Sequence, residues 1–170
     1  MNKHKIFFIT GASGAGKTTA LKKIQENNAD KFSFNYFDSV GVPSSEEMVR
    51  DFGSGESWQR ATTVKWVETM LTNQTDEPSV LDGQIRPSFI DEACEKHNFT
   101  NFKVVLFDCS DEARKQRLVT RGHPELANDD MMNWAKYLRE EAQKRGYVII
   151  DNTEMTEEET RDELIKILNE

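Results

Sequence analysis

The pattern with the clearest chemistry lies near the start of the chain. Residues 11–18 match G-x-x-x-x-G-K-S/T at every fixed position. Glycines let the backbone turn its N–H groups around phosphate oxygens, and a helix that follows presents its amino-terminal end to the same anion. Lys17 would reach the β- and γ-phosphates, and the Thr18 hydroxyl would bind Mg²⁺. We therefore predict a binding site for Mg²⁺–ATP. The residues predicted to form it are Gly11, Ala12, Ser13, Gly14, Ala15, Gly16, Lys17, Thr18 and Thr19.

Aspartates follow several short apolar runs that are typical of buried strands. Asp82 comes directly after residues 79–81, and Asp38 follows an alternating run. Ligands of an open parallel sheet bind beyond the carboxyl ends of its strands, so both carboxylates belong at the edge of the phosphate loop. Asp82 is the candidate for holding Mg²⁺; a turn-forming role is the alternative for each aspartate. Asp108 also ends a predicted strand, where we expect it to cap the next helix, with Ser110 as the competing cap.

Three arginines share one face of a predicted helix. Arg114, Arg117 and Arg121 follow one another at i, i+3 and i+7. A guanidinium group binds two phosphate oxygens at once, and phosphoryl transfer gains most from charge placed around the migrating group. We predict catalytic roles for Arg117 and Arg121. The alternative, a solvated basic face offset by Asp111 and Glu112, is favoured for Arg114.

The elements that must position these side chains alternate along the chain. Strands are expected over 6–9, 32–37, 79–81, 104–107 and 147–150, and helices over 17–28, 58–71, 87–96, 111–120 and 129–144. Ser44 or Ser45 is the candidate cap of a further helix, and residues 156–159 form a capping box that opens the last one. This alternation predicts an α/β fold with a five-stranded parallel sheet and right-handed crossovers.

Length and charge limit the possible functions. The chain has 170 residues, which fits one domain spanning 1–170. A net charge of −8 disfavours binding to nucleic acid and to anionic membranes. Apolar runs such as 6–9 are far shorter than the roughly 20 residues that a membrane helix needs. Two cysteines and no secretion signal in residues 1–10 lead us to expect a cytoplasmic protein, a monomer or weak dimer, without nucleic-acid or membrane partners.

Several segments resemble the nucleoside monophosphate kinase family, which includes adenylate kinase. Residues 82–86, Asp-Gly-Gln-Ile-Arg, are similar to the family segment D-G-F-P-R. Residues 117–122 are similar to its R-L-x-x-R-G entry to the lid, and residues 129–130 fall at its D-D pair. Residues 48–50 resemble the segment whose arginine binds the acceptor phosphate. The matches follow the family order over most of the chain.

The resemblance implies a P-loop NTPase-type three-layer α/β/α sandwich with a short helical lid over about residues 117–130. It implies that the acceptor binds within about residues 38–75. Asp82 would hold Mg²⁺ through water. Arg50 and Arg86 would bind the acceptor phosphate. The implied activity is transfer of the γ-phosphoryl group of Mg²⁺–ATP to a small molecule.

The resemblance implies that Arg117 and Arg121 close over the transferred phosphoryl group. It places Arg139 near the position of a further family arginine. The lid departs from the family pattern, because the arginine expected near Ala127 is absent and the segment 122–128 is short. Relatives with short lids include shikimate and gluconate kinases, which phosphorylate hydroxyl groups.

The chemistry of the acceptor distinguishes the possible reactions. A monophosphate has a second pKa of about 6, so near neutral pH it needs cations and no base. The combination of Arg50, Arg86 and Arg121 favours such an acceptor. A hydroxyl group has a proton to lose, and Asp38 is then the general base. With a nucleotide acceptor Asp38 would instead bind a sugar hydroxyl, help to hold the metal, or only cap a turn. The third possibility is a sensor that binds ATP without catalysis.

Overall fold

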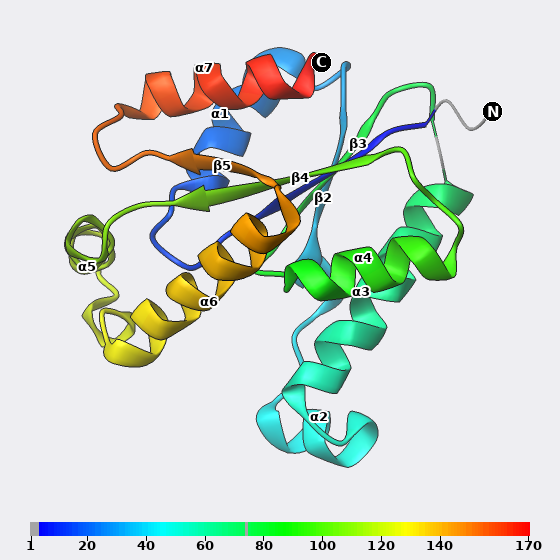
Figure 1. Ribbon diagram of the computed structural model, residues 1–170, viewed down its shortest axis with the longest axis horizontal. Helices are drawn as coiled ribbons and strands as arrows, with labels where there is room; N and C mark the ends of the chain where they lie inside the picture. The colour runs from blue at the N-terminus through cyan, green and yellow to red at the C-terminus, as the bar shows by residue number, and fades with distance from the viewer. Residues whose placement is uncertain (1–3, 74) are drawn as a thin grey trace.

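A parallel sheet of five strands forms the centre of the protein, and the computed structural model describes residues 4–73 and 75–170 (Figure 1). The strands are β1 (Ile6–Thr10), β2 (Ser33–Tyr36), β3 (Ser79–Asp82), β4 (Phe102–Asp108) and β5 (Val148–Asp151). Their spatial order is β2-β3-β1-β4-β5, so β1 lies in the middle. Phe8 of β1 lies opposite Leu81 on one side and Val104 on the other. The predicted five-stranded parallel fold is confirmed.

The central strand is apolar because both of its faces are covered. All five residues of β1 are buried. Its side chains alternate between two cores, with Ile6 and Phe8 in one and Phe7 and Ile9 in the other. A strand with helices on both faces has no solvent-facing side, which explains why the run 6–9 lacks polar residues.

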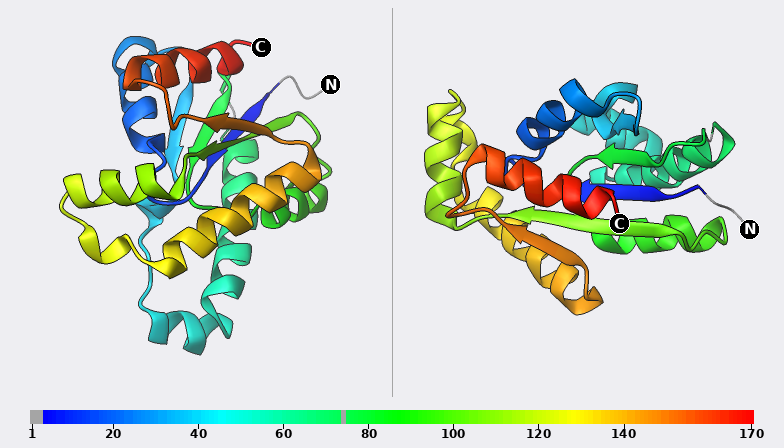
Figure 2. Two further views of the ribbon diagram at one scale, coloured as in Figure 1. Left: turned by 60° about the vertical axis from the view of Figure 1, so that its left-hand side comes forward. Right: turned by 90° about the horizontal axis from the view of Figure 1, so that it is seen from above.

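Helices cover both faces of the sheet and produce the expected three layers (Figure 2). They are α1 (Lys17–Asn28), α2 (Ser45–Phe52), α3 (Gly55–Thr72), α4 (Pro87–Lys96), α5 (Asp111–Thr120), α6 (Asp129–Arg145) and α7 (Glu157–Leu168), with short 3₁₀ turns η1 (Phe37–Val40) and η2 (Pro124–Leu126). Helices α1 and α7 pack on the face of Phe7 and Ile9. Helices α3 and α4 pack on the face of Ile6 and Phe8, and α6 covers Leu106.

Side-chain caps begin several helices as the sequence predicts, with one correction. Ser44 caps α2 in a capping box with Glu47, and the capping box at 156–159 opens α7. The prediction that Asp108 caps the next helix is wrong. Ser110 caps α5 by accepting a hydrogen bond from a backbone N–H. The Asp108 carboxylate is buried and binds arginines instead.

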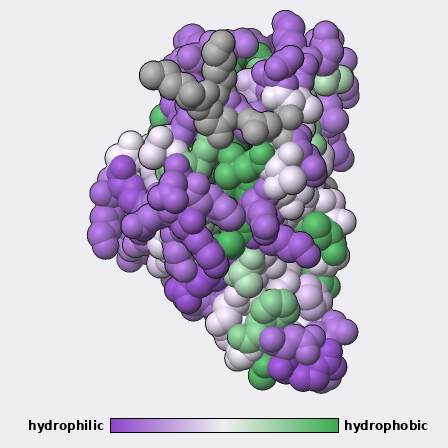
Figure 3. Space-filling model, turned by 90° about the vertical axis from the view of Figure 1, so that its right-hand side faces the viewer, coloured by the Kyte–Doolittle hydropathy of each residue, from purple (hydrophilic) through white to green (hydrophobic). Residues whose placement is uncertain are grey.

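The region expected to bind the acceptor, residues 38–75, extends beyond the sheet, and Gln74 within it lies outside the described residues. Helix α2 lies at the lower end of the molecule in Figure 1. Apolar side chains reach the surface in this lower part (Figure 3), and the exposed residues there are Val40, Val42, Val49 and Phe52. Within the described residues, no helix is both long enough and apolar enough to cross a membrane. Residues 1–3, part of the segment judged not to be a secretion signal, are also outside the described range.

Candidate active site

The loop between β1 and α1 has a backbone conformation that its glycines permit. Gly11, Gly14 and Gly16 have φ angles of +142°, +83° and +85°, which side chains other than hydrogen rarely allow. A Cβ atom at Gly11 would lie 2.4 Å from the carbonyl oxygen of Phe107. The first two glycines let the loop pass closely over β4 and α5, and Gly16 begins α1 at the base of the loop.

Lys17 is buried at the first turn of α1, and its ammonium group is held within the loop. Its Nζ donates a hydrogen bond of 2.6 Å to the carbonyl of Gly11. Burial lowers the pKa of Lys17 from 10.5 to about 8. The Asp82 and Asp38 carboxylates oppose this shift, whereas the Arg114 charge adds to it. A poorly hydrated positive charge at this position is well prepared to receive an anion.

Thr18 and Asp82 meet beside Lys17 and form an oxygen-rich corner. Thr18 Oγ1 donates to Asp82 Oδ2 at 3.4 Å. Asp82 Oδ1 is buried and has no hydrogen-bond partner within the described residues. Burial raises the pKa of Asp82, and the Lys17 charge opposes that change. An unpartnered carboxylate oxygen next to a hydroxyl suits a hard cation such as Mg²⁺, so the residues fit the predicted metal.

Arg114, the first arginine of the α5 face, lies directly beneath the loop. It is 0% exposed. Its Nη1 donates to the carbonyls of Ala12 at 3.3 Å and Ser13 at 2.9 Å. Its Nη2 donates to Asp108 Oδ1 at 2.9 Å, and Arg139 of α6 binds the same carboxylate. The solvated basic face favoured for Arg114 is therefore a wrong prediction, because this side chain is in the interior.

The other two arginines of α5 contact the loop and the start of α1. Arg117 Nη1 reaches the carbonyl of Gly14 at 3.4 Å and the side chain of Asn152 at 2.8 Å. Arg121 Nη2 donates to Thr19 Oγ1 at 3.2 Å. The spacing of the three arginines places them on one face of α5. That face contacts the phosphate loop and the start of α1.

Asn152 is a buried member of this site that the sequence analysis did not select. Its Nδ2 donates to the carbonyl of Ala15 at 2.7 Å, and its Oδ1 accepts from Arg117. Asn152 directly follows β5, just as Asp82 ends β3. The signal that could have identified it was therefore the same one used for the aspartates, a polar residue at the carboxyl end of a strand.

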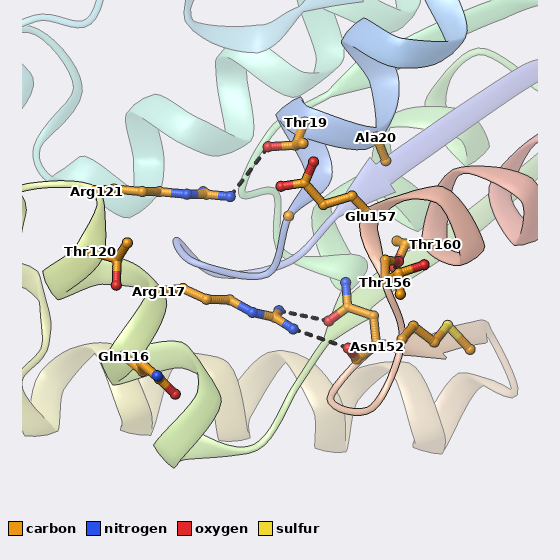
Figure 4. A pocket seen from close by; sticks show the side chains of 12 residues that line it. Thr19, Ala20, Gln116, Arg117, Thr120, Arg121, Asn152, Thr156, Glu157 and Thr160 are labelled. Carbon is orange, nitrogen blue, oxygen red and sulfur yellow. Dashed lines mark hydrogen bonds between the residues drawn. The ribbon is translucent and has the colours of Figure 1, made fainter.

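A cavity of about 430 Å³ opens beside the loop (Figure 4). It is bounded by the start of α1, the carboxyl half of α5 and the segment between β5 and α7. The lining residues are Gly16, Thr19, Ala20, Gln116, Arg117, Thr120, Arg121, Asn152, Met155, Thr156, Glu157 and Thr160. This volume is in the range of small-molecule pockets, and its position next to the loop suits the nucleoside part of a nucleotide.

Asp38 lies on η1 at the same edge of the sheet. Its side chain is exposed, and it is close enough to act electrostatically on two residues of the site. It raises the pKa of Lys17 and contributes to the raised pKa of Asp82. Trp66 Nε1 of α3 donates a hydrogen bond to the carbonyl of Phe37, the residue that precedes Asp38. Tyr36 of β2 lies opposite Asp82 of β3, so Asp38 follows two residues beyond the strand partner of Asp82, on a turn that α3 contacts.

The segment 82–86 connects the phosphate loop to helices α3 and α6. Gln84 donates to Ser13 Oγ at 2.9 Å and accepts from Trp134 Nε1 at 3.0 Å. Arg86 Nη1 donates to Gln59 at 2.9 Å, and its guanidinium lies over the Trp134 ring. Arg86 is thus held at the border of the site.

Arg50 is the predicted site residue that the structure leaves away from the phosphate loop. Its side chain is 69% exposed on α2 and pairs with its neighbour Asp51. Figure 1 and the left view of Figure 2 place α2 at the opposite end of the molecule from α1 and α7, two of the helices that line the cavity. On the neighbouring helix α3, Arg60 pairs with Glu92 of α4.

The strand order, the glycine loop and the buried Lys17 define a P-loop nucleotide-binding fold. The chain belongs to the AAA domain family, whose model matches residues 7–134. No curated protein matches the chain.

Solved structures of similar fold include three kinases. A gluconokinase from Sinorhizobium meliloti 1021 has a TM-score of 0.69 and 19% identity, covering 97% of this chain and 91% of its own. A deoxyadenosine kinase from M. mycoides with bound dCMP and dCDP has a TM-score of 0.63 and 14% identity, covering 96% and 98%. A shikimate kinase from Acinetobacter baumannii in complex with shikimate has a TM-score of 0.59 and 18% identity, covering 98% and 92%. At these identities the likeness establishes the fold.

Proposed function

We propose that this protein is a kinase that transfers the γ-phosphoryl group of ATP to a hydroxyl group of a small molecule. The observation that carries the proposal is that three groups lie at one edge of the sheet: Lys17 in the phosphate loop, Asp82 at the end of β3, and Asp38 just beyond the end of β2, whose Tyr36 lies opposite Asp82. The solved kinases of similar fold support the general activity, since they act on nucleosides or small metabolites by their printed names.

The chain's own groups suit each part of this reaction. Backbone N–H groups of residues 11–18 and the Lys17 ammonium bind the phosphates. Thr18 and Asp82 would hold Mg²⁺, which neutralises phosphate charge when bound. Arg117 and Arg121 place positive charge beside the loop, where it stabilises the transferred group.

Asp38 is proposed as the general base. The acceptor oxygen attacks the γ-phosphorus, the bond between that phosphorus and the bridging oxygen breaks, and ADP leaves with the bond's electron pair. The acceptor proton passes to the Asp38 carboxylate. Its exposed position on η1 leaves this carboxylate accessible to an acceptor.

A phosphorylated acceptor is the second candidate, and one observation favours it. Arg86 lies at the border of the site and carries a charge that a phosphate could use. The position of Arg50 weighs against this candidate, because its guanidinium is exposed and already paired on α2. We therefore favour a hydroxyl acceptor, whereas the sequence alone favours a phosphorylated acceptor.

An acceptor screen tests the proposal. Purified protein, Mg²⁺–ATP and a panel of sugars, hydroxy acids, nucleosides and nucleoside monophosphates are assayed for ADP release above the rate without acceptor. Turnover with hydroxyl compounds that Asp38→Asn reduces at least ~10²-fold supports the proposal. Turnover confined to nucleoside monophosphates would instead support a phosphorylated acceptor, the second candidate. ATP binding without turnover across the panel would favour a sensor and contradict the kinase.

A further inference from the structure

The buried position of Arg114 is unusual, because removing a guanidinium from water is energetically costly. Position 114 is in the middle of α5, against the phosphate loop, and a Cβ atom at Gly14 would lie 3.1 Å from Arg114 Cγ. An apolar side chain could fill the same space. The structure instead places here a fixed cation that makes three hydrogen bonds to Ala12, Ser13 and Asp108.

The two carbonyls that Arg114 holds belong to consecutive peptide units. The carbonyl of Ala12 shares a planar trans peptide with the N–H of Ser13, and the carbonyl of Ser13 shares one with the N–H of Gly14. The C=O and N–H of a trans peptide point in opposite directions. Carbonyls drawn toward α5 therefore turn these two N–H groups to the other side of the loop, away from α5.

Asp108 fixes the guanidinium in this orientation. It is buried at the end of β4 and accepts from Arg114 at 2.9 Å, while Arg139 binds its other oxygen. Arg139 comes from α6 and Arg114 from α5, the helices in which the expected lid segment, about residues 117–130, ends and begins. The Asp108 carboxylate of β4 is thus linked to α5 and α6 through these two arginines, and to the phosphate loop through Arg114.

We infer that Arg114, anchored by Asp108, is a positioning residue that orients the phosphate loop for binding of a nucleoside triphosphate. The inference rests on the proposed function only in that the loop must bind ATP. The guanidinium also adds positive potential at Lys17, together with Arg121 and against Asp82 and Asp38.

The test compares ATP binding by wild type, Arg114→Met and Arg114→Lys, using calorimetry with Mg²⁺–ATP and no acceptor. The surface arginine Arg161, which pairs with Asp162 on α7, provides the control Arg161→Met. We expect Arg114→Met to weaken ATP binding about 10- to 100-fold, the scale of lost charge-assisted hydrogen bonds. Arg114→Lys falls between this variant and wild type, because one ammonium cannot serve both carbonyls and Asp108. The control binds as wild type does.

The melting temperature, measured for each variant beside its ATP affinity, separates positioning from a purely structural role. A role confined to stability would lower the melting temperature of Arg114→Met and leave the ATP affinity of the folded protein unchanged. Partial recovery of that affinity in Arg114→Lys indicates that a cation at this position orients the loop.

The outcomes distinguish the inference from the proposed function. Wild-type affinity in a folded Arg114→Met, or in Arg114→Lys where the first variant does not fold, overturns the inference. A wild-type protein that binds no ATP overturns the proposed function instead. Weakened binding in Asp108→Asn with a normal fold supports the anchoring role of that carboxylate, and unchanged binding contradicts it.

Discussion

Arg117 of α5 makes two hydrogen bonds to Asn152, donating to its side-chain oxygen at 2.8 Å and to its backbone carbonyl at 3.0 Å. Asn152 in turn donates to the carbonyl of Ala15. The phosphate loop, α5 and the segment after β5 are therefore joined through one buried amide. Because Arg117 and Asn152 also line the cavity, this relationship couples the shape of the cavity to that of the loop.

Asn152→Ala is expected to weaken ATP binding about tenfold and to destabilise the fold by roughly 1–3 kcal/mol, since it leaves a buried carbonyl and Arg117 without their partner. Calorimetric ATP titration and urea unfolding measure the two effects. The control is Asn169→Ala at the exposed end of α7, which should alter neither. Full ATP affinity in folded Asn152→Ala would show that the amide has no part in shaping the site.

Lys17→Met is expected to lower phosphoryl transfer by ~10³-fold or more, because a charge at the transferring group is lost. The same variant should unfold at an equal or higher temperature at pH 7. The reason is that burial disfavours the charged form of Lys17, as its lowered pKa shows. Kinetics and thermal unfolding test both parts. Substantial turnover in this variant would reject the assignment of the phosphate loop.

The pH dependence of ATP binding follows from the same pKa. The protonated Lys17 attracts phosphate, and its pKa in the free protein is about 8. Affinity should therefore be constant near pH 7 and decrease as the pH rises through about 8. Phosphate has a second pKa of about 6, so its own charge changes little in this window. Titrations between pH 7 and 9.5 measure the effect, and an affinity that is flat over this range contradicts it.

Asp82→Asn is expected to raise the Mg²⁺ concentration needed for half-maximal activity at least tenfold, since an amide is a poorer ligand for a hard cation. The protein should remain folded, because burial already disfavours the ionised carboxylate. Activity measured across a Mg²⁺ series at saturating ATP gives the shift. An unchanged Mg²⁺ dependence would remove Asp82 from the metal site.

Arg121→Ala is expected to lower kcat by ~10-fold or more and to change ATP affinity less, because its charge matters most in the transition state. In the free protein its guanidinium contacts only the hydroxyl of Thr19 at 3.2 Å among the contacts described, so little ground-state structure depends on it. Steady-state kinetics with the acceptor found in the screen separates kcat from KM. A change confined to ATP affinity would assign Arg121 to binding alone.

The phosphate loop and the alternation of strands and helices could be predicted from the sequence because they depend on nearby residues. Glycine conformations in residues 11–16, the buried run 6–9 and the capping boxes are local properties, and the sequence-based boundaries of β1 and α1 agree closely with the structure. The position of Asp82 beside the loop could be predicted for a related reason, since every parallel strand brings its carboxyl end to the same edge.

Only the tertiary structure decided which charges are buried and what they hold. Arg114 and Arg117 have the same residue type on the same helix face, yet one is enclosed beneath the loop and the other lines a cavity. Arg50 matched a family segment but lies exposed on α2. Asn152 bonds to Ala15 across 137 positions of the chain. Such pairings depend on how distant elements pack, and because solvation of a charge changes with burial, its role follows from that packing rather than from the neighbouring sequence.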